Sequence, residues 1–394
     1  MEILRFVVAW SLLVSSSFKV GSEEVVNFAP GDVPAIYNFG DSNSDTGGIA
    51  AAFFPMAAPC GETFFHRPVG RASDGRLMID FIGEKLGFVF RSGSCANRDG
   101  TDSGMPERLK LPYLSAYLDS VGTNFRHGAN FATGGATIRQ QNESWFENGI
   151  SPFPLDIQVE HYIQFKARSA YLYGQANNET SQRSRLPVPE DFSKALYTFD
   201  IGQNDLAVGF RKMTDKQLRD ALPDIVNQFA AAVQHLYQEG ARAFWIHNTG
   251  PIGCLPVSVV NIHNPNPGYL DELGCIKGQN DIAVEFNKQL NDRVIQLRAK
   301  LPQAALTYVD IYTAKYGLIS NAKNQGFEDP FKICCGHHKN GISIWCSNKA
   351  IVNGTEVYGG SCANPSKAIS WDGVHYTEAA NLWIVNQILK TTPP

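Results

Sequence analysis

Residues 35–48 read AIYNFGDSNSDTGG, an apolar run that ends at Gly-Asp-Ser and passes into a polar, glycine-terminated turn. An apolar run of this length, bounded by turn residues, is typical of a strand that is buried on both faces. Gly, Asp and Ser are common turn residues, so the tripeptide alone is compatible with an ordinary strand-ending turn and with a serine presented as a nucleophile. The rest of the chain has to decide between these two interpretations.

The pattern of a buried strand followed by a helix recurs along the chain. Strands are expected at residues 34–39, 194–202, 241–250 and 304–312. Helices are expected at residues 76–87, 214–239, 279–300 and 377–390. Such alternation predicts crossover units, and therefore a parallel sheet covered by helices on both faces. The polar stretches 91–108 and 173–191 are interpreted as surface loops because the alternation resumes after each, which predicts a single domain over residues 23–394.

Polar residues gather where these strands end. Ser42 follows the first expected strand, and Asn204 follows the second in the segment IGQND. Asp372 and His375 lie in SWDGVHYTEAAN, directly before the last expected helix. The segment HGANFATGGAT, residues 127–137, follows no long strand and is expected to be a loop that enters a helix. Ligands of parallel α/β sheets bind at the carboxyl ends of the strands, so these segments are the candidate site.

Asp372 and His375 have the spacing that an activated serine needs. A serine hydroxyl is a poor nucleophile near neutral pH and requires a base within hydrogen-bond reach. Among the nine histidines, His375 is the one with a carboxylate three residues upstream in a tight turn. We expect Asp372 to contact the ring nitrogen that faces away from Ser42, which fixes the tautomer and stabilises the imidazolium. Taken alone, the same residues are compatible with a polar turn before a capped helix.

Acyl transfer also needs hydrogen-bond donors at the developing oxyanion. Gly135 offers a backbone N–H in a loop where no side chain blocks close approach. Asn204 offers its side-chain amide, and Ser42 offers its own backbone N–H. Each has an alternative interpretation, a simple turn at Gly134 and Gly135 and a helix cap at Asn204. This chemistry requires no metal and no organic cofactor, and none is expected.

The first 22 residues have the features of a secretory signal peptide. A short polar start is followed by an apolar and small-residue run from Phe6 to Ser17, and then by Val20-Gly21-Ser22. The run is about a dozen residues long, too short to span a bilayer, so cleavage is favoured over a retained membrane anchor. We therefore expect a protein that is extracellular or in the cell wall, without stable membrane insertion. N-glycosylation sequons begin at Asn142, Asn178 and Asn353.

Eight cysteines in a secreted chain predict four disulfide bonds. Local bridges are expected between Cys60 and Cys95 and between Cys254 and Cys275. The last four cysteines are expected to pair among themselves; they are Cys334, Cys335, Cys346 and Cys362. The stretch CCGHH at residues 334–338 is also compatible with zinc, but adjacent cysteines are poor chelators of one ion, so disulfides are favoured and no metal site is expected.

The composition is that of a globular protein. The chain has 394 residues, of which 43% are hydrophobic and 18% are charged, and these values argue against general disorder. The net charge of -4 and the scattered basic residues give no reason to expect nucleic acid or an anionic membrane as a partner. The family resemblance described next, and not the composition, implies a small-molecule or polysaccharide ester as the partner.

Four segments, in this order and at these separations, resemble the four conserved blocks of the GDSL esterase/lipase family, also called SGNH hydrolases. They are FGDSNSDTGG, GANFATGGAT, IGQNDL and DGVHYTEAAN. GRASDGR, GPIGCLP and CCG further resemble the secreted plant branch, and the resemblance spans residues 34–389. It implies a flavodoxin-like, three-layer α/β/α fold with a mostly parallel sheet of about five strands. It also implies a nucleophile, a base with its orienting acid, and two oxyanion donors; these are Ser42, His375 with Asp372, and Gly135 with Asn204.

The implied activity is hydrolysis of carboxylic esters of glycans, glycosides or lipids through an acyl-enzyme on Ser42. A mean hydropathy of -0.19 and the lack of an evident amphipathic lid favour short-acyl substrates. An acyltransferase would use the same acyl-enzyme with a second alcohol in place of water. A fucosidase-type glycosidase, as described for some similar plant proteins, normally needs two carboxylates about 5–9.5 Å apart, and no motif indicates such a pair. A non-catalytic binding protein is disfavoured because all four segments are complete.

Overall fold

The computed structural model describes residues 33–86, 113–176, 182–260, 262–339 and 342–391. The expected signal peptide, Cys95 and Asn178 lie outside the described residues. None of the helices in the described part of the chain combines the length and the apolar character that crossing a bilayer requires.

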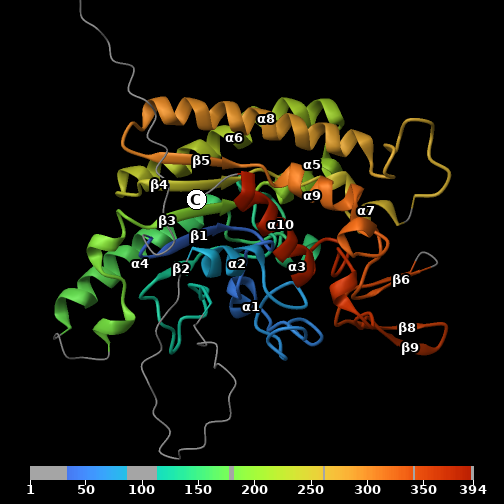
Figure 1. Ribbon diagram of the computed structural model, residues 1–394, viewed down its shortest axis with the longest axis horizontal. Coiled ribbons are helices and arrows are strands. Elements are labelled where there is room, and N and C mark those ends of the chain that lie inside the picture. The colour runs from blue at the N-terminus through green and yellow to red at the C-terminus, as the bar shows by residue number, and fades with distance from the viewer. Residues whose placement is uncertain (1–32, 87–112, 177–181, 261, 340–341, 392–394) are drawn as a thin grey trace, which may run out of the picture.

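A parallel sheet of five strands forms the centre of the described structure, in the order β2-β1-β3-β4-β5 (Figure 1). The strands are β1 Ile36–Gly40, β2 Gly128–Asn130, β3 Leu196–Asp200, β4 Ala243–His247 and β5 Ala305–Val309. All four strands expected from the sequence are present, and β1 extends one residue beyond its expected end. The parallel pairing places the carboxyl ends of all five strands at one edge.

The short strand β2 corrects the sequence analysis. Residues 127–137 were expected to form a loop that enters a helix, but Gly128–Asn130 pairs with residues 36–38 of β1. The loop after β2 does not lead directly into a helix, because the next one, α3, begins at Trp145. A strand of three residues is too short to show a periodic pattern, so its pairing with β1 decides its conformation.

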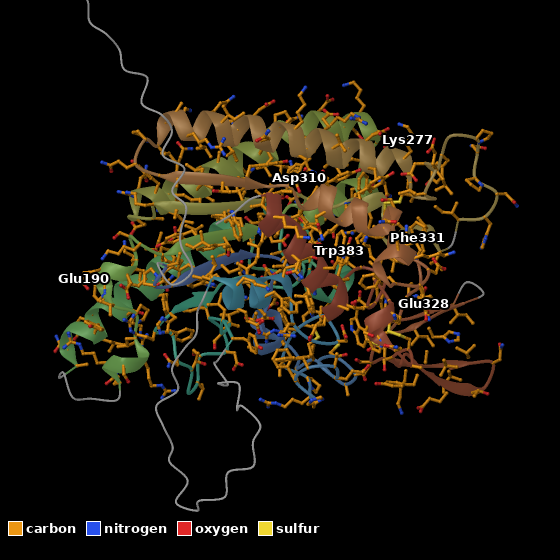
Figure 2. The ribbon with its side chains drawn as sticks, in the orientation of Figure 1. Glu190, Lys277, Asp310, Glu328, Phe331 and Trp383 are labelled. Atoms are coloured by element: carbon orange, nitrogen blue, oxygen red, sulfur yellow. A yellow bond between two sulfur atoms is a disulfide. The ribbon has the colours of Figure 1, made fainter. Side chains whose placement is uncertain are left out.

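Alternate residues of each strand face different layers of helices. Tyr37 and Phe39 of β1 pack in one core with α4, α6 and α8, whereas Ile36 packs in a second core with α2, α9 and α10. The first layer consists of α4 Leu155–Gln175, α6 Asp215–Gln238 and α8 Lys277–Lys300. The second consists of α2 Met78–Lys85, α9 Ile311–Ser320 and α10 Glu378–Thr391. Side chains fill the space between the layers (Figure 2), and the fold is the expected three-layer α/β/α arrangement.

Local capping explains where the main helices begin. At the start of α6, the Thr214 hydroxyl accepts from the N–H of Gln217 at 3.3 Å, and the Gln217 side chain accepts from the N–H of Thr214 at 2.9 Å. This reciprocal pair satisfies two N–H groups that would otherwise lack partners. The carboxylate of Asp310, labelled in Figure 2, accepts from the N–H of Thr313 at 3.0 Å and caps α9. These contacts therefore define where α6 and α9 begin.

Shorter helices lie in the connections between these elements. The α-helices are α1 Gly48–Ala52, α3 Trp145–Asn148, α5 Gln203–Lys212 and α7 Pro256–Val259. The 3₁₀ helices are η1 Arg183–Arg185, η2 Pro189–Asp191, η3 Ile252–Cys254, η4 Ala322–Gln325 and η5 Pro365–Lys367. The sequence analysis did not identify α4, α5 or α9, whereas α6, α8 and α10 lie within two residues of their expected bounds.

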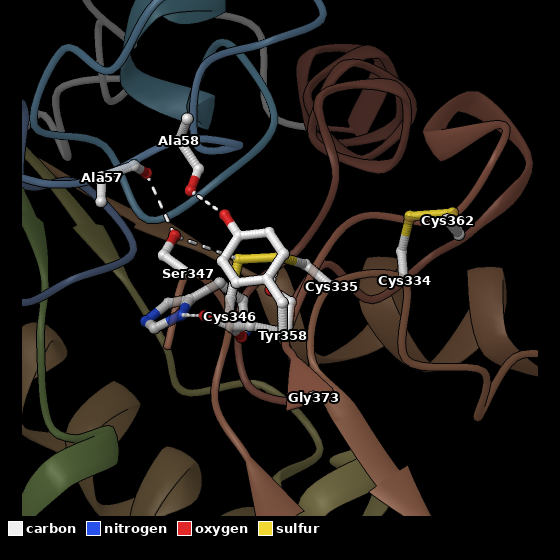
Figure 3. The surroundings of a disulfide bond; sticks show 12 residues. Ala57, Ala58, Cys334, Cys335, Cys346, Ser347, Tyr358, Cys362 and Gly373 are labelled. Atoms are coloured by element: carbon white, nitrogen blue, oxygen red, sulfur yellow. Dashed lines mark hydrogen bonds and ion pairs between the residues drawn. A yellow bond between two sulfur atoms is a disulfide. The ribbon is translucent and has the colours of Figure 1, made fainter. Parts of the chain in front are cut away.

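Residues 334–362, here called the C-terminal arm, form two hairpins outside the sheet (Figure 1). The hairpins pair β6 His337–Lys339 with β7 Ile342–Ile344 and β8 Lys349–Val352 with β9 Thr355–Tyr358. The arm contacts the loop after α1, because Ser347 Oγ donates to the carbonyl oxygen of Ala57 at 3.1 Å and Tyr358 OH donates to that of Ala58 at 2.6 Å (Figure 3).

Disulfide bonds tie the arm together. Cys334 is bonded to Cys362 and Cys335 to Cys346, which confirms that the last four cysteines pair among themselves. The expected bridge between Cys254 and Cys275 is also present. Both cysteines of the CCGHH stretch are therefore occupied by disulfides. Cys60 is buried, and its expected partner, Cys95, is outside the described residues.

Candidate active site

Two strand ends and the turn before α10 line one cavity at the carboxyl edge of the sheet. Ser42 follows β1, Asn204 lies in the first turn of α5 after β3, and Val374 and Tyr376 flank His375 in the turn. His375 lines an adjoining cavity that shares Val374 and Tyr376 with the first. The structure therefore brings Ser42, Asn204 and His375 into one region, although they are separated by more than 150 residues in the sequence.

A tight turn presents Ser42 at the end of β1. The N–H groups of Ser44 and Asp45 both donate to the carbonyl oxygen of Asp41, at 3.1 and 2.9 Å. The Asp41 carboxylate accepts from the N–H of Asn43 at 3.0 Å. The N–H of Ser42 has no acceptor within the described part of the chain, and the residue is half-buried at the cavity wall. Both the hydroxyl and the N–H of Ser42 are thus available to a ligand.

Asp45 joins this turn to the loop after β2. Its buried carboxylate accepts from the backbone N–H groups of Gly47 at 2.7 Å, Ile49 at 3.0 Å and Gly134 at 2.7 Å, and also from Gly48. Burial raises the pKa of Asp45, and these donors oppose the rise because they stabilise the charged form. The Ser42 turn and the glycine-rich loop are therefore held together by one carboxylate.

Gly135 occupies a position that only glycine fits without strain. Its φ is 78°, in the left-handed region, and a Cβ atom there would lie 1.9 Å from the carbonyl oxygen of Gly149. The N–H of the preceding Gly134 is used by Asp45, whereas the N–H of Gly135 has no acceptor among the described residues. Of the two glycines, Gly135 is therefore the one with a free donor.

The side chain of Asn204 lies between this loop and the Ser42 turn. Asn204 Nδ2 donates to the carbonyl oxygen of Ala136 at 2.9 Å and to Asp41 Oδ2 at 3.3 Å. The contact with Ala136 holds the amide next to Gly135, and the contact with Asp41 holds it next to Ser42. The three donors named from the sequence are thus linked by short contacts through two neighbouring loops.

The turn before α10 fixes the geometry of Asp372 and His375. Asp372 Oδ2 lies 2.6 Å from His375 Nδ1, and Asp372 Oδ1 accepts from the N–H of His375 at 2.8 Å. Gly373 permits this fold, because its φ is 95° and a Cβ there would lie 2.5 Å from Val257 Cγ1. Thr377 Oγ1 accepts from the N–H of residue 380 at 3.3 Å and caps α10.

The electrostatics of this pair match its geometry. Burial opposes ionisation of Asp372, but the charge and hydrogen bonds of His375 hold the pKa of that carboxyl below its usual value. Burial likewise opposes the charge on His375, but Asp372 holds the pKa of the imidazole above its usual value. His375 Nε2 is buried and has no partner within the described residues. One ring nitrogen is therefore fixed by a carboxylate while the other is free to take up a proton.

The disulfide-bonded arm is hydrogen-bonded to the segment that directly precedes this turn. The N–H of Cys334 donates to the carbonyl oxygen of Ser370 at 3.2 Å, and the N–H of Cys335 donates to that of Trp371. Trp371 in turn donates its N–H to the carbonyl oxygen of His375 at 2.8 Å. Figure 3 shows both disulfides and Gly373 in this region. The two bridges therefore restrain the backbone that carries Asp372 and His375.

Several buried groups at the site were not identified from the sequence. Asp200 and Lys315 are isolated charged residues whose role depends on partners from other segments, and no local pattern marks them. Asp45 lies within the segment FGDSNSDTGG, but its contacts with the loop after β2 could not be read from that segment. Of the sequons, Asn142 and Asn353 are exposed, as glycan attachment requires, and their glycosylation stays a prediction.

A hydroxyl, an imidazole oriented by a carboxylate, and N–H donors from neighbouring loops are the components of a serine hydrolase. The pattern of the family described as GDSL-like Lipase/Acylhydrolase matches residues 36–388. The chain is 58% identical over 364 residues to a protein of Arabidopsis thaliana named GDSL esterase/lipase At5g14450, covering 92% of this chain and 87% of that one. It is 47% identical over 364 residues to a protein of Hevea brasiliensis named Esterase, covering 91% and 85%. It is also 46% identical over 360 residues to a protein of Arabidopsis thaliana named Alpha-L-fucosidase 3, covering 90% of each.

The chain belongs to the GDSL lipase/acylhydrolase family and is a carboxylic ester hydrolase.

Proposed function

We propose that this hydrolase acts outside the cytosol on short acyl esters of glycans or glycosides, through an acyl-enzyme on Ser42. The observation that carries the proposal is the free Nε2 of His375, whose neighbours Val374 and Tyr376 line the cavity of Ser42, with Nδ1 held by Asp372 at 2.6 Å. In this arrangement the imidazole accepts the hydroxyl proton and Asp372 stabilises the resulting imidazolium.

The reaction follows from these contacts. His375 Nε2 takes the proton of Ser42, and Ser42 Oγ attacks the ester carbonyl carbon. The N–H groups of Ser42 and Gly135 and the amide of Asn204 receive the negative charge that develops on the carbonyl oxygen. His375 then gives its proton to the leaving alcohol. A water molecule then takes the place of the alcohol. His375 removes a proton from the water, the water oxygen attacks the acyl carbonyl carbon, and His375 returns the proton to Ser42 as the acid is released.

The oxyanion assignment predicts the effect of Asn204→Ala. Because this change removes one of three donors, kcat should fall by about 100 to 1000-fold while KM changes little. Steady-state kinetics with 4-nitrophenyl acetate measure both constants. Asn321→Ala, at the exposed end of α9, is the matched control and should behave as the unmodified protein. A kcat within a few-fold of the unmodified value for Asn204→Ala would show that this amide does not stabilise the oxyanion.

The lining of the cavity is compatible with a short acyl group, because its walls are partly apolar, with Ile252, Leu255 and Val374 among them. In a series of 4-nitrophenyl esters we expect acetate and butyrate to be hydrolysed, with kcat/KM for palmitate at least about tenfold lower. A kcat/KM that rises steadily toward palmitate would instead indicate a lipase for long acyl chains.

The alternatives are disfavoured by particular observations. A glycosidase needs one carboxyl group as acid and another as base or nucleophile, but Asp372 is bound to His375, and Asp41 accepts from Asn43 and Asn204. An acyltransferase would share the acyl-enzyme. Adding a sugar alcohol to the assay distinguishes it, because transfer produces a new ester while hydrolysis releases only the acid.

The proposal also includes an extracellular location and a single catalytic domain. The described disulfides are typical of an oxidising compartment, which supports an extracellular location and removal of residues 1–22 as a signal peptide. The family match over residues 36–388 supports one catalytic domain within residues 23–394.

A further inference from the structure

A cluster of buried ionisable side chains lies beneath the candidate site. Its members come from the ends of β1, β3 and β4 and from α9, and each is at most 4% exposed; they are Asp41, Asp200, His247 and Lys315. Burying a charge is costly unless another charge or a hydrogen bond compensates it. The mechanism above uses none of these groups as acid, base or nucleophile, so their presence at this place requires a separate explanation.

Lys315 is the buried cation of this cluster. Its stem lies flat against the backbone after β4, because a Cβ atom at Gly250 would lie 2.8 Å from Lys315 Cδ. Its Nζ lies 4.5 Å above the centre of the Tyr376 ring, next to His375. Within the described residues Nζ has no hydrogen bond and no carboxylate oxygen within 4.0 Å. The residue also lines the cavity of Ser42.

The two carboxylates of the cluster are connected to the site by hydrogen bonds. The N–H of Asp41 donates to the carbonyl oxygen of Asp200 at 3.0 Å, so the two residues are adjacent across β1 and β3. Asp200 Oδ1 accepts from Gln203 Nε2 at 2.7 Å, and its Oδ2 lies 3.5 Å from His247 Nδ1. Asp41 Oδ2 accepts from Asn204 Nδ2 at 3.3 Å. A change in the charge of Asp41 therefore acts directly on the proposed oxyanion donor.

Two negative charges this close to each other need a compensating positive charge. Burial and the neighbouring Asp200 raise the pKa of Asp41 to about 7. Burial lowers the pKa of Lys315, and the charges of Asp200 and Asp41 oppose that change. These interactions are mutual, so Lys315 favours the ionised form of both carboxylates. Lys315 also opposes the positive charge on His375.

We infer that Lys315 is a positioning residue for the oxyanion site: its buried ammonium balances the carboxylates of Asp41 and Asp200, and the Asp41 carboxylate holds the amide of Asn204 toward the substrate. This inference rests on the proposed function. The ionisable groups that interact with Lys315 are Asp41 after β1, Asp200 of β3, and His375 and Tyr376 before α10. His247 of β4 lies against Asp200.

The test is the pH dependence of kcat/KM for Lys315→Met with 4-nitrophenyl acetate. Without the ammonium, Asp41 and His375 both bind protons more tightly. The acidic limb of the pH profile of kcat/KM should therefore move to higher pH by about one unit. The value of kcat/KM should then fall about tenfold at pH 6 and stay within about threefold of the unmodified protein at pH 9. Lys288→Met, at an exposed position of α8, is the matched control and should leave the limb in place.

Asp200→Asn provides a second test that does not depend on the folding of the lysine variant. Removing this negative charge should move the acidic limb in the opposite direction, toward lower pH, and the double variant should lie between the two single variants. Damage to packing alone would lower kcat/KM at all pH values without shifting the limb.

The inference is wrong if Lys315→Met and Asp200→Asn both leave the limb unchanged, or if they move it in the same direction. Either result leaves the esterase proposal intact. The proposed function itself fails only if the unmodified protein does not hydrolyse the ester, so the two failures are distinguishable.

Discussion

Ester hydrolysis should fall by about 10⁶-fold in kcat when Ser42 is replaced with alanine, because the proposed acyl-enzyme forms on its hydroxyl. The N–H donors and the cavity remain in this variant, so substrate binding should be retained. Steady-state hydrolysis of 4-nitrophenyl acetate measures kcat, and circular dichroism with a thermal melt checks that the secreted variant is folded.

The matched control for this variant is Ser193→Ala, which removes an exposed hydroxyl before β3. It should retain full activity. A folded Ser42→Ala protein that keeps more than about a hundredth of the original kcat would exclude Ser42 as the nucleophile, since loss of such a residue normally costs several orders of magnitude.

Replacing Asp372 with asparagine should lower kcat by about 10⁴-fold. The amide is close in size to the carboxylate, so the turn should fold, but the negative charge that stabilises the imidazolium of His375 is lost. The 2.6 Å contact with Nδ1 would also permit the wrong tautomer of the ring. The same assay measures the loss, and Asp220→Asn, on the exposed face of α6, is the control.

The pH profile of Asp372→Asn adds an independent check. Asp372 raises the pKa of His375, so its removal should move the acidic limb of the residual activity to lower pH. A limb that moves upward, or a loss of activity below about tenfold, would show that this carboxylate does not act through His375.

Much of this architecture could be predicted from the sequence because its decisive signals are local. The buried strands at 34–39 and 194–202 are short apolar runs that end in turn residues, and the parallel sheet follows from their alternation with helices. The pairing of Asp372 with His375 was predictable because both residues lie in one turn, where spacing alone determines what can touch.

The rest depends on contacts between distant segments. Gly128–Asn130 becomes a strand only because β1 offers a partner, and α4 was not identified, although its last residues fall in the stretch 173–191 that was interpreted as a loop. Lys315 lies more than 100 residues from Asp200, and nothing in the residues around either one indicates that both belong to one buried cluster. Charge clusters of this kind become visible only when the fold has placed them.

The most direct test of the central proposal is covalent labelling with a fluorophosphonate, which reacts with activated serine hydroxyls. After incubation of the intact protein, mass spectrometry of its peptides identifies the modified residue while ester hydrolysis is measured in parallel. We predict one adduct per chain, on Ser42, with activity lost in proportion to labelling and no adduct on Ser42→Ala. Full activity in a fully labelled protein, or an adduct on a different serine that accompanies the loss, would contradict the proposal.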